Sequence, residues 1–177
     1  MIIDPRQPGE ETRRFGHLFT IASWLITILL LTVLFTGILD YRENPNRSPK
    51  SSVGPDGSKA VVLRRNRAGH YIASGRINGK PVRFIIDTGA TDVVLSDSVA
   101  DELQLIRGAR STSRTASGTV STWRTRLDRI EIGNITQQNV AASILPAMPG
   151  SDVLLGMSFL KRVDLVQQDD RLTIRQK

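Results

Sequence analysis

Cysteine is absent from the 177-residue sequence, and histidine occurs only as His17 and His70. Without cysteine the chain has no disulfide, no cysteine nucleophile and no thiolate ligand for a metal ion. Two isolated histidines do not make a metal cluster, so we expect no metal site and no cofactor. The sequence also has no evident internal repeat, so each motif in it occurs once.

Charge of one sign is in moderate excess, with 24 lysines and arginines against 17 aspartates and glutamates. The two signs balance within residues 1–39, so the excess lies in the rest of the chain. A basic domain favours anionic membrane surfaces or nucleic acid. The basic residues are scattered, however, and no nucleic-acid motif organises them. We therefore expect a solvated, charged surface and no nucleic-acid partner.

One long apolar run, residues 18–39, contains no charged side chain. Its length meets the requirement of about 20 residues for a helix that spans a bilayer. A cleaved signal peptide is the alternative, but its apolar core is usually shorter, about 7–15 residues. Residues 36–40 also make a poor cleavage site. We predict an uncleaved transmembrane helix that contacts the lipid bilayer through residues 18–39.

This run divides the chain into four parts. Residues 1–17 are read as a polar tail and residues 18–39 as the transmembrane helix. Residues 40–58 contain prolines, glycines and serines without apolar periodicity, which predicts a flexible linker. Residues 59–177 remain for one folded domain.

Short β-branched and aromatic runs dominate this domain and predict a small, mainly β, barrel-like fold. The Asn78-Gly79 pair predicts a tight hairpin between two of its strands. Ser96 is expected to cap a short helix that ends at Leu103. The expected strands are residues 60–63, 71–77, 80–86, 92–95, 110–115, 119–132, 139–145, 163–166 and 172–174.

The segment Phe-Ile-Ile-Asp-Thr-Gly-Ala-Thr, residues 84–91, ends an apolar strand in a carboxylate. An acid at that point is costly unless it is hydrogen-bonded or functional. Gly89 permits a positive φ and hence a sharp turn after Asp87. Alone, Asp-Thr-Gly is common in turns. Between two apolar strands it indicates an acid held in place for chemistry.

Three segments in this order resemble the retropepsin-like, or retroviral-type, aspartic proteases. They are residues 84–91, the small-residue tip at 115–118, and the apolar segment Val-Leu-Leu-Gly-Met-Ser-Phe-Leu at 153–160. The resemblance runs from about residue 71 to the C terminus. Together with the apolar run, it points to a bacterial subgroup with one transmembrane helix before the protease domain. It implies a small closed β-barrel with one or two short helices.

The resemblance also implies roles for individual residues. It makes Asp87 catalytic and places a flap over the substrate. The implied residues are Thr88, Gly89 and Ala90 in support of the active-site loop, Ala116, Ser117 and Gly118 in the flap, and Leu154, Leu155 and Gly156 in a second loop packed against the first.

Peptide hydrolysis of this type needs two carboxylates that share one proton. The motif supplies only Asp87, and Asp152, Asp164, Asp169 and Asp170 lack the strand-Asp-Thr-Gly arrangement. A symmetric homodimer, in which two copies of Asp87 meet across a two-fold axis, supplies the pair. We therefore expect a homodimer that cleaves a peptide or protein substrate.

The leading hypothesis is a single-pass aspartic endopeptidase, a hydrolase of the bacterial inner membrane. Equal numbers of basic residues flank the apolar run, but Arg13 and Arg14, together with His17, crowd their end of it more closely. They favour a cytoplasmic N terminus and a periplasmic domain. Two alternatives stay open. One is a non-catalytic, membrane-tethered binding or assembly module of the same fold, and the other is a scaffold whose basic domain contacts anionic lipid.

Overall fold

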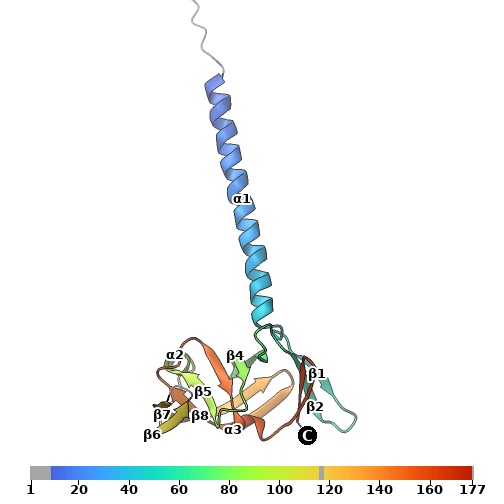
Figure 1. The fold of residues 1–177 in the computed structure, drawn as a ribbon, viewed down its shortest axis with the longest axis vertical. Helices are drawn as coiled ribbons and strands as arrows, with labels where there is room; N and C mark the ends of the chain where they lie inside the picture. Colours follow the sequence, from blue (N-terminus) through green and yellow to red (C-terminus); the bar gives the residue numbers. More distant parts are fainter. Residues whose placement is uncertain (1–8, 116–117, 177) are drawn as a thin grey trace, which may run out of the picture. The chain divides into compact units, whose positions relative to one another are not determined.

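The computed structural model describes residues 9–115 and 118–176 and divides the chain into two compact units, Met1–Tyr41 and Arg42–Lys177. Helix α1 (Gly9–Glu43) accounts for the described part of the first unit (Figure 1). Its segment Phe19–Gly37 has a mean hydropathy of 2.2 and no buried residue. By length and composition this segment is able to cross a membrane, although a signal sequence meets the same criterion.

Three threonines within this apolar segment satisfy their hydroxyl groups inside the helix. Thr27, Thr32 and Thr36 each donate a hydrogen bond to the carbonyl oxygen four residues earlier, at 2.9, 2.8 and 2.9 Å. A polar group in hydrocarbon must find its partner within the protein. These hydroxyls therefore add little to the cost of placing the helix in a bilayer.

The second unit contains the remaining elements, which are short strands and two short helices (Figure 1). The strands are β1 (Lys50–Val53), β2 (Lys59–Arg64), β3 (Ile72–Ile77), β4 (Lys80–Ile86), β5 (Val93–Ser96), β6 (Arg110–Thr115), β7 (Gly118–Ile132), β8 (Ile135–Leu145), β9 (Asp152–Leu155), β10 (Asp164–Gln168) and β11 (Arg171–Gln176); the helices are α2 (Asp97–Glu102) and α3 (Met157–Leu160).

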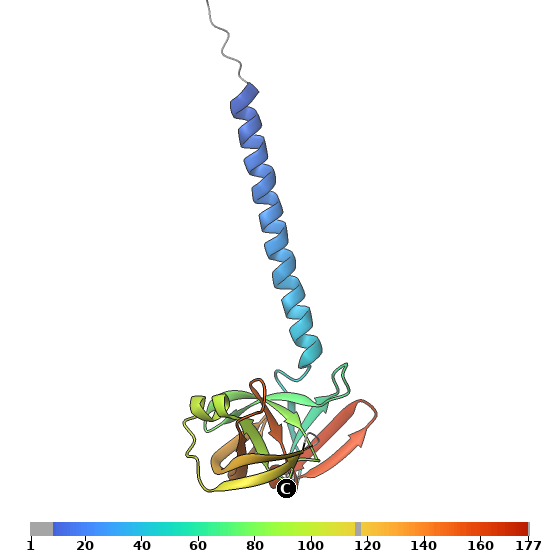
Figure 2. The ribbon, with the colours of Figure 1, turned by 60° about the vertical axis from the view of Figure 1, so that its left-hand side comes forward.

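Seven strands form one sheet in the order β3-β4-β9-β5-β8-β7-β6, and β3 also pairs with β7. The pairings from β3 through β4, β9, β5, β8 and β7 therefore return to β3 and close a circuit. Strand β6 extends this sheet as one arm of the β6–β7 hairpin, yellow to orange in Figure 2. The mainly β fold with two short helices in the domain is confirmed.

A second sheet of four strands, in the order β1-β2-β11-β10, was not expected as a separate unit. Its strands β10 and β11 were predicted at residues 163–166 and 172–174; they pair with each other, and β11 pairs with β2 in an antiparallel register. Strand β2 alternates buried and exposed positions, so Val61 and Leu63 enter the core at 0% exposure. This alternation is the period-2 pattern of a sheet with one covered face.

Local turn and cap signals in the sequence are confirmed. Asn78 and Gly79 connect β3 and β4 with φ values of 50° and 82°, as a two-residue hairpin of this hand requires. Ser96 caps α2, since its hydroxyl accepts from the backbone N–H of Val99. Strand β8 begins earlier than predicted, at Ile135, because Gly133 and Asn134 turn the chain directly back from β7.

The ends of the apolar helix differ from the sequence-based boundaries. Residues 9–17, expected in a polar tail, belong to α1, and residues 1–8 lie outside the described part of the chain. Helix α1 also continues to Glu43, into the range 40–58 that was expected to be a flexible linker. The rest of that range contains β1, whose four residues pair with β2.

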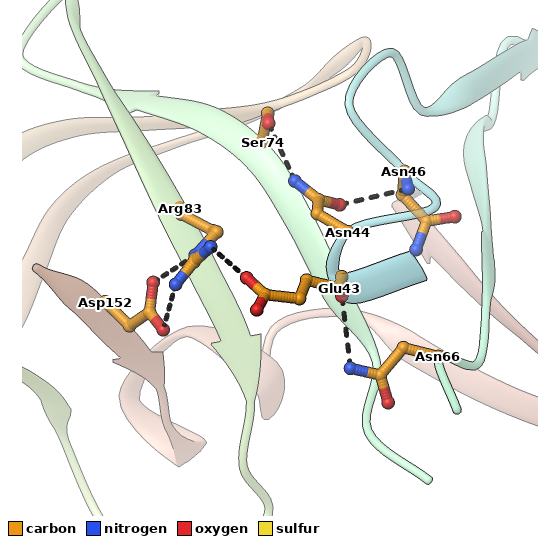
Figure 3. A network of polar contacts seen from close by, with 7 residues as sticks. All are labelled: Glu43, Asn44, Asn46, Asn66, Ser74, Arg83 and Asp152. Atoms are coloured by element: carbon orange, nitrogen blue, oxygen red, sulfur yellow. Dashed lines mark hydrogen bonds and ion pairs between the residues drawn. The ribbon is translucent and has the colours of Figure 1, made fainter. Parts of the chain in front are cut away.

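Buried asparagines attach this range to the domain (Figure 3). Asn46 is 4% exposed, and its side chain accepts from Arg64 N at 2.7 Å and donates to Arg64 O and Ile72 O at 2.9 and 2.6 Å. Its carbonyl accepts from Ser74 N, and Asn44 Nδ2 donates to Ser74 Oγ at 3.0 Å. The segment therefore behaves as an integral strand-like edge of the domain. The sequence did not predict this, because prolines and serines are typical of a linker and the asparagines contact residues far along the chain.

We predict that Asn46→Ala destabilises the full-length chain by about 2–4 kcal/mol, because one buried and two part-buried backbone groups lose their hydrogen bonds. Thermal unfolding in detergent micelles measures the change. Asn66→Ala is the matched control, since the bonds of Asn66 to Glu43 and His70 are exposed and water replaces them. Equal stability of the two variants would show that residues 44–46 are not part of the folded unit.

Candidate active site

Asp87 directly follows β4 and begins the turn that leads out of the sheet. Strand β4 runs between β3, to which it is antiparallel, and β9, to which it is parallel. The backbone N–H of Ile86 donates to Tyr71 O at 2.9 Å, and that of Asp87 donates to Leu155 O at 3.1 Å. Because strands on both sides hold the last residues of β4, the position of the Asp87 backbone is fixed by the sheet.

The turn after Asp87 orients its carboxylate. Gly89 N donates to Asp87 Oδ1 at 2.9 Å, and Ala90 N donates to Asp87 O at 3.3 Å. Asp87 is half-buried, whereas Thr88 and Gly89 are exposed. Among the described residues, the Gly89 N–H is the one hydrogen-bond donor to this carboxylate. Oδ2 is thus left to face water or another molecule.

The second loop, between β9 and α3, packs against this turn through backbone groups. Met157 N donates to Ala90 O at 2.8 Å, and Ser158 N donates to Thr91 O at 2.9 Å. The first N–H groups of a helix have no partner inside the helix. Here the loop that follows Asp87 supplies their acceptors, so the two segments satisfy each other.

Gly156 is the point of closest approach between the two loops. It is buried, and a Cβ built on it would overlap Asp92 O and lie 2.6 Å from Ala90 O. Its φ of −91° is open to any residue, so the requirement for glycine is steric. Leu155 is fully buried and Leu154 half-buried beside it. The structure thus brings the predicted second-loop residues against the predicted active-site loop.

Ser158 links these loops to strands β5 and β8 and was not singled out from the sequence. It is 6% exposed, accepts from Val93 N at 3.0 Å and donates to Ala141 O at 2.8 Å. The available signal was a hydroxyl within the apolar segment 153–160. Its bridging role depends on β5 and β8 lying side by side, which the local pattern does not reveal.

A cleft of about 740 Å³ opens in front of Asp87. The β6–β7 hairpin forms one wall, and the Asp87 turn with parts of β5, β8 and β9 forms the other. The described lining residues are Asp87, Gly89, Ala90, Thr91, Asp92, Val94, Ser111, Thr112, Ser113, Arg114, Thr122, Arg124, Ser143, Leu145 and Leu154.

The predicted flap falls at the tip of this hairpin. Ala116 and Ser117 lie outside the described residues, and Gly118 begins β7 with a φ of 117°. Such a φ favours glycine. The arms on either side, β6 and β7, were predicted at residues 110–115 and 119–132 and are confirmed within one residue.

An ion pair joins the two strands that carry these loops (Figure 3). Arg83 on β4 lies directly opposite Asp152 on β9 and donates to it through Nε and Nη2, the latter at 2.8 Å. Glu43 approaches Arg83 Nη1 at 3.5 Å. The hydrogen bond to Asp152 raises the pKa of Arg83 above its ordinary value, and the pair connects β4 with β9 through two charge-assisted hydrogen bonds.

Comparison with known proteins agrees with this geometry. The sequence profile of the family described as gag-polyprotein putative aspartyl protease matches residues 73–162, just over half of the chain. The chain belongs to the retropepsin-like aspartic proteases. The match includes β4, the Asp87 turn, the β6–β7 hairpin and the Gly156 loop.

One solved retropepsin-like structure and two curated relatives are similar over most of the chain. The crystal structure of a retropepsin-like aspartic protease from Rickettsia conorii has a TM-score of 0.58 at 25% identity, over 73% of this chain and 96% of that one. An uncharacterized protein of a Sinorhizobium species is 28% identical over 94% of this chain and 77% of its own length. An uncharacterized protein of Rickettsia prowazekii (strain Madrid E) is 26% identical over 93% and 73%.

Family membership is thereby confirmed, while the roles of the individual residues stay predictions. Asp87, Gly89, Ala90 and Leu154 line one cleft. Thr88, exposed beside them, is not part of its lining. For metal binding, the described residues contain no group of three or more histidine, aspartate or glutamate side chains suited to hold an ion.

We predict that Gly156→Ala costs about 3 kcal/mol of stability, because its methyl group meets backbone oxygens that cannot rotate away. The same substitution at Gly37, where a Cβ meets nothing within 4 Å, is the control. Chemical or thermal unfolding of both variants gives the comparison. A Gly156→Ala chain as stable as the control would mean that the loops are not in close contact.

Proposed function

We propose that this retropepsin-like chain is a membrane-anchored aspartic endopeptidase whose active site contains Asp87 from two subunits. The observation that carries the proposal is the position of Asp87, fixed at the end of β4 with one carboxylate oxygen facing a 740 Å³ cleft. A cleft of this size accommodates several side chains of an extended peptide. The β6–β7 hairpin supplies a wall that would cover such a peptide.

The proposed chemistry needs only the two carboxylates and water. Close like charges do not both ionise, so the pair holds one proton between them. The charged carboxylate removes a proton from water as the water oxygen attacks the peptide carbonyl carbon. The protonated carboxylate gives its proton to the carbonyl oxygen, which forms a gem-diol. As the C–N bond breaks, the carboxyl group that took the proton from water protonates the leaving nitrogen, and the other carboxylate regains a proton from a gem-diol hydroxyl. The hydrogen bond from Gly89 keeps Oδ1 of each Asp87 in position during these transfers.

A second subunit is the proposed source of the second carboxylate. Asp92 is the other acid that lines the cleft among the described residues, but its Oδ2 accepts from Ser143 Oγ at 3.2 Å on β8. It also follows the turn and has no Thr-Gly of its own. Two-fold symmetry instead places two equivalent Asp87 turns face to face.

The apolar segment Phe19–Gly37 supports anchoring in a bacterial inner membrane, with the domain in the periplasm as the proposed side. Confinement to a bilayer raises the effective concentration of the two subunits. Arg13 and Arg14, on the N-terminal side of this segment, favour retention of that end in the cytoplasm. The anchor would therefore promote assembly of the active site.

We predict that Asp87→Asn lowers peptidase activity at least about 1000-fold, because an amide neither shares the proton nor activates water. Cleavage of a peptide library at mildly acidic and neutral pH is the measurement. Asp101→Asn, on the exposed surface of α2, is the control and should retain wild-type activity. A folded Asp87→Asn variant that keeps its activity would rule out the mechanism. A folded wild type without activity would favour the non-catalytic module.

The dimeric site predicts how inactive subunits affect active ones. When wild-type and Asp87→Asn chains are co-reconstituted in equal amounts, random pairing leaves about a quarter of the dimers with two aspartates. At constant total protein, activity should fall to about a quarter of the pure wild-type value, whereas self-sufficient monomers would retain about half. The ratio is read from initial rates. Retention of half the activity, with loss of activity in Asp92→Asn, would assign the second carboxylate to the same chain.

A further inference from the structure

Five exposed arginines gather where the chain joins the second unit, and we call them the Arg64 patch. The turn between β2 and β3 lies at this point because Asn66 Nδ2 donates to Glu43 O at 3.1 Å. Asn46 binds both backbone groups of Arg64, at the end of β2. The patch consists of Arg42, Arg64, Arg65, Arg67 and Arg171.

Two members of the patch oppose each other across neighbouring strands. Arg64 at the end of β2 is the direct antiparallel partner of Arg171 at the start of β11. Like charges in this arrangement destabilise a sheet. Asp170 approaches Arg171 only at 3.9 Å, with both side chains more than half exposed. The fold thus keeps a repulsive pair that an external anion would relieve.

Among the residues that the structure describes, the other arginines of the patch form no ion pair with an acid. Arg65 donates to the carbonyl oxygen of Asp169 at 2.8 Å and lies 5.7 Å from the centre of the Tyr71 ring, and both of these partners are neutral. Within the described residues, no ion pair is formed by Arg64 or Arg67. The acids nearby are Glu43, which approaches Arg83, together with Asp169 and Asp170. The local balance is therefore positive.

The length of the tether limits how far this patch lies from a bilayer. The apolar segment ends at Gly37, and Asn66 binds the carbonyl of Glu43. Six residues span at most about 20 Å even when fully extended. Whatever the orientation of the two units, the point at Asn66 where the chain joins the patch stays within about 20 Å of the end of the apolar segment. A basic residue that reaches the headgroups of an anionic leaflet strengthens binding about fivefold, and this gain falls off within a Debye length.

We propose that the Arg64 patch binds anionic phospholipid headgroups of the membrane in which the chain is anchored. This inference rests on the proposed anchoring and is independent of peptidase activity. Charge complementarity is its basis, since the arginines of the patch outnumber the acids near them and the tether holds the patch close to one anionic surface. Docking of this face would limit the orientations of the domain relative to the bilayer.

The test uses full-length protein in lipid nanodiscs and exploits the absence of cysteine. Ala68→Cys, in the exposed turn beside the patch, carries a fluorophore, and headgroup-labelled lipid quenches it. We expect stronger quenching in discs of phosphatidylcholine with phosphatidylglycerol than in phosphatidylcholine alone, and loss of the difference at high salt. Replacing Arg64 and Arg67 by glutamine should weaken docking about 30-fold, as two charges of this value imply.

Arg110→Gln with Arg126→Gln is the matched control, because it removes the same charge from β6 and β7, outside the patch. Equal quenching in neutral and anionic discs would overturn the proposal, and so would equal effects of the two double variants. Flotation of the same protein with lipid tests the anchor itself, and peptide cleavage tests the enzyme. Failure of docking is thereby distinguished from failure of anchoring or of catalysis.

Discussion

The structure of the candidate site depends on the backbone contact between the Asp87 turn and the Gly156 loop. Two N–H groups at the start of α3 find their acceptors in Ala90 and Thr91, and the absence of a side chain at Gly156 lets the loops approach. The parallel pairing of β4 with β9 aligns the two loops before they meet. The Asp87 side chain receives only one hydrogen bond among the described residues. Its position therefore depends mainly on the backbone of the turn, which this contact supports.

The contact also explains why distant parts of the domain matter for the site. Ser158 connects the Gly156 loop to β5 and β8, while Arg83 and Asp152 lock β4 against β9. Glu43, the last residue of α1, and Asn46 connect the segment 43–46 to the same strands of the domain. A change in that segment therefore reaches the strand that carries Asp87 through a short chain of hydrogen bonds.

The features predictable from sequence were those that local chemistry encodes. Asn78 and Gly79 require positive φ and gave the β3–β4 hairpin, and the apolar run before Asp87 gave β4 and its turn. Strand β1 was not predicted from the sequence because its four residues are all exposed and show no alternation between buried and exposed positions. The structural role of Asn46 was not predicted because its hydrogen-bond partners, Arg64 and Ile72, lie far along the chain. Non-local hydrogen bonds leave no periodic signal.

A single aspartate and an apolar helix together constrain the proposed function more than either does alone. A carboxylate with one free oxygen lacks the second group that must hold the shared proton. A soluble domain would dimerise only at high concentration. Domains tethered to a membrane are confined to a surface, so their effective concentration is higher. In the proposed membrane-anchored state the same tether would keep the Arg64 patch near the lipid, and docking of the patch would limit how the domain rotates. Restricted rotation lowers the orientational cost of bringing two Asp87 turns together, so lipid contact and active-site assembly would favour each other.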